Sequence, residues 1–247
     1  MKRISRVTAV VIVIATTLAC ASASAQVVEL GATTPIAAPT CASPANCLII
    51  LTRTTALQTL SDSVLYPTKV KKAGWIVSFT VGLSRFSRNA KTEKNFLHVA
   101  DQDFGGTPQI ALTVLKPGPK NQFTVAAEGP LFHVEPYLGG VTQLPLSLPP
   151  TFSAFNALPV AAGDVIALTV PTWAPVLSYN LSSSKFTYRQ SRKTKCNHFA
   201  VSQTSQLTIG ANTQYLCTYS GSRVEYSATE VTNQPYPKGY VHGPRKP

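Results

Sequence analysis

Strict alternation of large and small side chains is the feature that most limits what this chain can fold into. Between Trp75 and Leu83 every second residue is large and apolar, and Ser, Thr, Gly and one Ile stand between them. A period of two places the large side chains on one face of a β-strand, whereas a helix would distribute them around its circumference. The segment therefore predicts a strand with one face on a hydrophobic core.

The same texture recurs along much of the chain. Residues 108–116 and 123–127 alternate on either side of a turn rich in Pro and Gly, so a hairpin is expected there. Further short strands are expected at 48–51, 131–135, 142–148, 164–170, 175–181, 207–210, 213–219 and 223–231. No apolar stretch after residue 26 has sustained helical spacing, and we interpret 84–107 as a long loop or mobile hairpin. The pattern predicts an all-β protein, an antiparallel β-sandwich with Greek-key or jelly-roll-like connections.

The first 25 residues have the parts of a secretory signal peptide. Three basic residues within the first six precede an uncharged, mostly apolar run at 7–20 and then the small residues Ala23-Ser24-Ala25. The apolar run is shorter than the roughly 20 residues that a membrane-spanning helix needs. Cleavage after Ala25 predicts a secreted, extracellular mature chain that begins at Gln26. The alternative is a lipid anchor on Cys20, although the Leu that normally leads such a cysteine stands one place too late.

Composition divides the mature chain into three parts. Three prolines interrupt residues 26–46, so an irregular N-terminal arm is expected there. Residues 47–231 are expected to form one β-sandwich domain, and residues 232–247, rich in Pro, Tyr, Gly and Lys, a disordered tail. Loss of the three basic residues of the signal peptide lowers the formal net charge from +12 to +9. That charge suits either plain solubility or an acidic partner.

Four cysteines in the mature chain predict two disulfides in an oxidising compartment. They are Cys41, Cys47, Cys196 and Cys217. Three pairings are possible, and the local pairs Cys41–Cys47 and Cys196–Cys217 are favoured because each closes a short loop. A zinc site is not indicated, since there is no C-x-x-C pair and His198 is the only imidazole close to a thiol in the sequence.

Four stretches between residues 64 and 231 carry a family resemblance. They are 70–83, 110–117, 159–168, and 217–219 with 223–228. In this order they resemble uncharacterised secreted β-sandwich proteins of high-GC Gram-positive bacteria. The motifs are those of strands and turns, so the resemblance implies the sandwich fold and brings no catalytic residues with it.

The main binding candidate is the basic and aromatic stretch before Cys196. Arg189, Arg192 and Lys193 stand close to Tyr188, a combination that suits a glycan or other polyanion through charge and stacking, although a solvated loop has the same composition. Nucleic acid is not an expected partner outside the cell. Trp173 lies between two prolines and is expected at the surface, where it would stack on a sugar or cover a sheet edge.

Motifs of known catalytic sites are missing from the sequence: there is no G-x-S-x-G, no H-E-x-x-H and no Gly-rich phosphate loop. His98, Asp101 and Asp103 resemble a cation site, but too few carboxylates follow for a calcium loop, so no metal or cofactor is predicted. The sequence therefore favours a secreted, non-enzymatic, envelope-associated binding module for a glycan or polyanion. An extracellular hydrolase of polysaccharide or peptide with a scattered active site and a structural surface protein remain alternatives.

Overall fold

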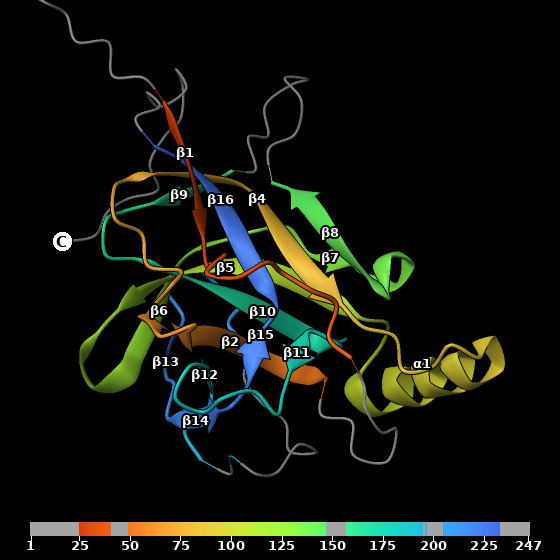
Figure 1. Cartoon of the computed structure of the whole chain (residues 1–247). Coiled ribbons are helices and arrows are strands. Elements are labelled where there is room, and N and C mark those ends of the chain that lie inside the picture. Colours follow the sequence, from red (N-terminus) through yellow and green to blue (C-terminus); the bar gives the residue numbers. More distant parts are fainter. Residues whose placement is uncertain (1–24, 41–48, 147–156, 195, 197–204, 233–247) are drawn as a thin grey trace, which may run out of the picture.

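Two antiparallel β-sheets pack face to face and form the body of the protein, and one helix projects to the side (Figure 1). The computed structural model describes residues 25–40, 49–146, 157–194, 196 and 205–232. This architecture confirms the predicted all-β sandwich. Of the helices in these ranges, none has the length and apolar character needed to cross a membrane.

Strands distant in sequence are neighbours in both sheets, as in Greek-key folds. The first sheet has the order β1 (Gln26–Leu30), β16 (Tyr226–Thr232), β4 (Gly74–Leu83) and β8 (Gly140–Pro145), with β9 (Leu158–Val160) also paired to β4. The second has the order β13 (Asn212–Gln214), β6 (Gln122–Glu128), β5 (Gln109–Pro117), β10 (Val165–Ala174), β2 (Leu51–Ser61), β12 (Thr187–Gln190) and β14 (Cys217–Ser220). Short strands complete the fold: β3 (Val64–Leu65) on β2, β7 (Phe132–His133) on β5, and β11 (Leu177–Ser178) with β15 (Arg223–Val224).

The main hydrophobic core lies between the two sheets. Phe79 and Val81 of β4 enter it from one side, and Leu112 of β5 and Leu168 of β10 from the other. A smaller cluster, which includes Tyr215, covers the opposite face of the second sheet. The central strands of that sheet are consequently buried on both faces.

The alternation expected in β4 is confirmed in its second half, where Phe79, Val81 and Leu83 are fully buried. Nearer its start the register with β16 shifts by one residue, and Val77 has no partner in β16. Such a bulge exchanges the two faces of a strand. For this reason Ile76 joins the core in the place that the sequence pattern assigned to Val77.

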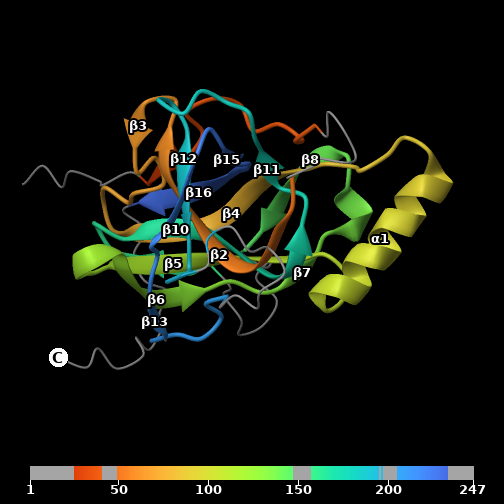
Figure 2. The ribbon, with the colours of Figure 1, turned by 90° about the horizontal axis from the view of Figure 1, so that it is seen from below.

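A helix replaces the long loop or mobile hairpin expected at 84–107, and that prediction is wrong. Helix α1 (Ala90–Phe104) is capped by Asn89, whose side chain accepts hydrogen bonds from two backbone N–H groups of the first turn. Gly105 ends it in the left-handed conformation, at φ 88°. Only Ala100 of the helix is buried, and the helix stands out from the body of the sandwich in both views (Figures 1 and 2).

The N-terminal arm is also more ordered than expected. Residues Gln26–Leu30 form β1, which pairs with β16 over its whole length. The prolines that led to the prediction of an irregular arm begin only at Pro35, so nothing opposes a strand before them. Residues 31–40 have no regular structure. Residues 1–24, including the predicted signal peptide and Cys20, and residues 233–247 of the predicted tail lie outside the described residues.

The remaining strand predictions have mixed outcomes. The hairpin is confirmed, because β5 and β6 pair across the turn at Pro119–Asn121. The strand expected at 207–210 is wrong: Gly210 has φ 87° and the chain turns there, with the backbone N–H of Ala211 donating to the carbonyl of Thr208. The strand expected at 48–51 begins at Leu51 and runs on to Ser61 as β2, in the centre of the second sheet.

Candidate functional site

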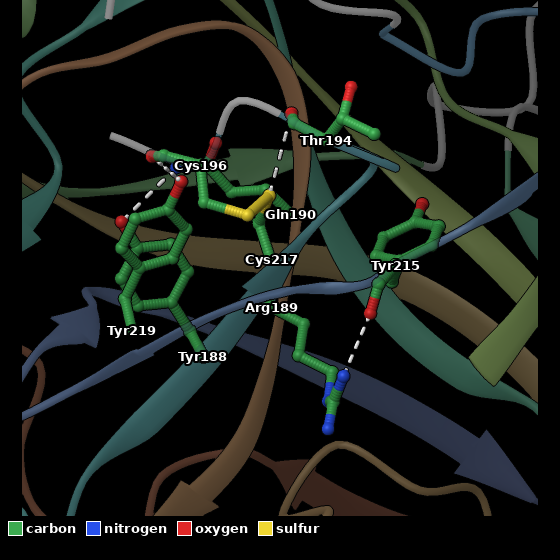
Figure 3. The surroundings of a disulfide bond; sticks show 8 residues. All are labelled: Tyr188, Arg189, Gln190, Thr194, Cys196, Tyr215, Cys217 and Tyr219. Atoms are coloured by element: carbon green, nitrogen blue, oxygen red, sulfur yellow. Dashed lines mark hydrogen bonds between the residues drawn. A yellow bond between two sulfur atoms is a disulfide. The ribbon is translucent and has the colours of Figure 1, made fainter. Parts of the chain in front are cut away.

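Most of the described candidate binding residues before Cys196 are buried or half-buried. Tyr188 is 2% exposed and Arg192 is 5% exposed. Arg189, on the opposite face of β12, is half-buried and donates from Nη1 to the carbonyl oxygen of Tyr215 at 2.9 Å (Figure 3). Lys193 is the only exposed residue among the four binding candidates of this stretch. The side chains of this stretch mainly contact the protein itself.

These contacts surround a disulfide. Cys196 and Cys217 are bonded, with their Cα atoms 5.2 Å apart, which confirms one of the two predicted pairs. The ring of Tyr188 stacks on that of Tyr219, with centroids 4.9 Å apart, and the Tyr219 hydroxyl donates to the carbonyl oxygen of Cys196 at 2.6 Å (Figure 3). The stretch therefore ties the chain near Cys196 to β12 and β14. The other predicted pair, Cys41–Cys47, lies outside the described residues.

Trp173 is not a surface residue, so its predicted position is wrong. It is 0% exposed and lies in β10, where the register with β2 shifts between Val170 and Trp173. Its indole N–H donates to Oδ1 of Asp101 on α1 at 3.0 Å, and its ring lies 5.7 Å from that of Phe86. The proline before it belongs to a bulge within a strand, and the indole packs beneath the helix.

The weak cation candidate also lies on α1. Asp101 and Asp103 are two positions apart on a helix, so their side chains point in different directions. Asp101 also already accepts a hydrogen bond from the indole N–H of Trp173. Over the described ranges, no three His, Cys, Asp or Glu side chains come together as a possible metal site.

A hollow of about 620 Å³ opens between the N-terminal arm and the segment that connects β4 to α1. Residues 38–40 of the arm and residues 84–88 line it together with Gly139. The lining includes Pro39, Thr40, Arg85, Phe86, Ser87 and Arg88. It therefore combines two guanidinium groups with hydroxyl groups and an aromatic ring.

Arg85 is held in place by the chain before β8. Its Nε donates to the carbonyl oxygen of Leu138 at 3.0 Å, and its side chain lies against Gly139. A Cβ at Gly139 would come within 2.6 Å of that Nε, and the φ of +86° at this position also favours Gly. Of the three guanidinium nitrogens, Nε alone makes a hydrogen bond within the described part of the chain. The two terminal nitrogens have no hydrogen-bond partner among the described residues.

The two arginines of the hollow form no ion pair within the described ranges. All ten acidic residues of the chain fall within the described ranges, and none forms an ion pair with Arg85 or Arg88 there. Glu93, the nearest acid in sequence, instead accepts a hydrogen bond on Oε2 from the backbone N–H of Ser87 at 2.7 Å. Lys91 and Lys94 add two exposed ammonium groups on the first turns of α1. We call Arg85, Arg88, Lys91 and Lys94 together the α1 basic cluster.

The α1 basic cluster and the basic residues before Cys196 do not converge on one surface. Helix α1 projects from one side of the molecule, while β12 lies away from it in both views (Figures 1 and 2) and β14 lies away from it in Figure 1. The α1 basic cluster is therefore a separate feature, and it is not part of a groove shared with Arg189 and Lys193. These cations fall within residues 84–107, for which the sequence predicts a long loop or mobile hairpin. The Arg85-Phe86-Ser87-Arg88 spacing just before the Asn89 cap is the sequence signal for this site.

An unusual carboxyl lies elsewhere, at the end of β6. Burial raises the pKa of Glu128 from 4.5 to about 7. Glu128 lies opposite Thr113 in the register between β6 and β5. The Thr113 hydroxyl lies 2.6 Å from the Thr169 hydroxyl, which in turn lies 2.8 Å from the Thr55 hydroxyl. A carboxyl with such a pKa has the strength of a general acid at neutral pH, but Glu128 does not line the hollow.

The titration of Glu128 is a direct test of this environment. We expect the NMR signal of its side-chain carboxyl to titrate with a midpoint near pH 7, and Glu128→Gln to remove that signal. Because the folded state binds this proton more tightly than the unfolded state, the stability that Glu128 contributes is complete below about pH 4.5 and is lost as the pH rises through 7. A midpoint near 4.5 would show that the carboxyl is solvated.

No family model, curated protein or solved structure matches this chain. The hollow and the α1 basic cluster beside it are the features of the described residues that bear on function.

Proposed function

We propose that the protein is an exported, non-enzymatic binding module for an acidic glycan of the cell envelope, with the hollow beside α1 as its binding site. The observation that carries this proposal is the presence of two guanidinium groups without acidic partners, Arg85 and Arg88, in a hollow of about 620 Å³. Export is supported by the sequence of the first 25 residues and by the Cys196–Cys217 disulfide, because such bonds persist in oxidising compartments.

The lining of the hollow suits a saccharide that carries carboxylate groups. Guanidinium groups bind carboxylates through two parallel hydrogen bonds, and Arg85 presents both of its terminal nitrogens. Phe86 supplies an aromatic surface, of the kind that packs against the C–H face of a sugar ring. Its ring is fixed by Phe96 and Trp173, at centroid distances of 5.6 and 5.7 Å. A ligand would thus meet a preorganised wall, which lowers the entropic cost of binding.

Removal of three charges tests the proposal. In the triple variant Arg88→Gln, Lys91→Gln, Lys94→Gln, we expect the affinity for polygalacturonate to fall about tenfold or more at low salt, measured by isothermal titration calorimetry. These side chains are exposed and make no hydrogen bonds within the described residues, so the fold is expected to remain intact.

The matched control is Lys71→Gln, Lys116→Gln, Lys120→Gln, which removes the same charge at exposed positions outside the hollow. Its affinity for polygalacturonate is expected to fall less than threefold. Equal losses in the two triple variants would mean that only the net charge attracts the polymer. Release of reducing ends from the polymer would instead favour the hydrolase alternative.

A further inference from the structure

The N-terminal arm is held against the first sheet by a buried ion pair. Nε of Arg223 lies 3.5 Å from Oε2 of Glu225, and the two side chains are 6% and 4% exposed. Burial raises the pKa of Glu225 in spite of the nearby Arg223. The attraction between the two charges therefore does not fully offset the cost of removing the carboxylate from water.

Both members of the pair bind the main chain of the arm. The Nη2 of Arg223 donates to the carbonyl oxygen of Thr34 at 3.0 Å, and its Nη1 donates to the Thr34 hydroxyl and, at 3.4 Å, to the carbonyl oxygen of Pro35. The Oε2 of Glu225 accepts from the backbone N–H of Ala37 at 3.4 Å. Main-chain groups of a segment without regular structure thus find their partners on two buried side chains.

Gly82 allows the arm to approach. A Cβ at this position of β4 would overlap the carbonyl group of Ala37. The backbone N–H of Gly82 also donates to the carbonyl oxygen of Glu225 at 2.9 Å. The arm, β4 and the ion pair therefore meet at one point, and any side chain at Gly82 would push the arm away.

The three residues that follow this point, 38–40, line the hollow together with Arg85 and Arg88. We propose, on the basis of the function proposed above, that docking of the arm by Gly82, Arg223 and Glu225 completes the binding site. The acidic glycan in turn holds the arm in its docked position. Because coupling between two equilibria is reciprocal, the ligand must favour docking by the same factor by which docking favours the ligand. Arg223 and Glu225 are then positioning residues that act through the arm.

Hydrogen exchange of the amides in residues 33–40, followed by mass spectrometry, tests the docking. In Gly82→Ala we expect these amides to exchange at least tenfold faster than in the wild-type protein, and the affinity for polygalacturonate to fall about tenfold. The matched control is Gly118→Ala, where a Cβ meets nothing closer than 3.4 Å. Glu225→Gln, which keeps the shape of the side chain and removes its charge, serves as the second variant if Gly82→Ala fails to fold.

The reciprocal experiment adds saturating polygalacturonate to the wild-type protein, and exchange of the same amides is expected to slow at least tenfold. If the polymer binds and neither their exchange nor the affinity of the folded variant changes, the coupling is overturned and the proposed function stands. If the wild-type protein does not bind the polymer, both proposals are overturned. Unchanged exchange in Gly82→Ala without ligand would show that Gly82 does not control docking.

Discussion

Replacement of Trp173 by Ala is expected to lower the free energy of unfolding by about 3–5 kcal/mol, in the range measured for the truncation of buried aromatic side chains. The indole is fully buried, so its removal leaves a cavity beneath α1. It also removes the ring beside Phe86 and the hydrogen-bond donor to Asp101. Denaturation by urea measures the loss, and hydrogen exchange in residues 90–104 is expected to accelerate, because α1 loses its main contact with β10.

Trp173→Phe separates packing from hydrogen bonding. This variant keeps an aromatic ring in the site and removes the indole N–H, and we expect it to cost about 1 kcal/mol, because Asp101 is only half-buried and can bind water instead. If both variants lost the same stability, the hydrogen bond would be the main contribution and the packing argument would be wrong. Since Phe86 is a wall of the hollow, we also expect the Ala variant to bind polygalacturonate more weakly than the Phe variant.

Strands were predictable where the two faces of the sheet differ in polarity. The second half of β4 and the β5–β6 hairpin alternate because one face meets the core. β2 was largely missed because its buried positions include polar side chains, such as Thr55 and Gln58. Their hydroxyl and amide groups are satisfied by partners from β10 and from residues near the end of the chain, including Thr169 and Val224. No local pattern reveals such partners.

Helix α1 was missed for a related reason. Its apolar residues Phe96, Leu97, Ala100 and Phe104 do have helical spacing, but charged and amide side chains between them conceal the period. The helix is anchored by Trp173, whose partner Asp101 is 72 positions away in the sequence. Single-sequence patterns carry no information on a contact of this kind, so Trp173 was assigned to the surface.

The candidate site combines residues that only the tertiary fold brings together. The hollow needs Arg85, the turn at Gly139 and the arm at 38–40, which come from three separate parts of the chain. The burial of Tyr188, in contrast, was available from the sequence: in a strand, Tyr188 and Gln190 share one face and Arg189 takes the other. No strand is among those expected over 187–190, so this burial is not among the predictions from the sequence.

Removal of the confirmed disulfide is expected to cost about 3 kcal/mol. The bond joins residues that are 21 positions apart, and closing a loop of that length reduces the conformational entropy of the unfolded chain by about this amount. The variant is Cys196→Ser, Cys217→Ser, which also leaves no free thiol at either position, and urea denaturation gives the loss. Arg189 and Tyr219 still bind carbonyl groups on either side of the former bond, so the folded structure of β12 and β14 is expected to persist. Dithiothreitol added to this double variant then measures the contribution of any remaining disulfide. If the double variant lost less than about 1 kcal/mol, the unfolded chain would already be compact around this loop, and the entropy argument would not apply to it.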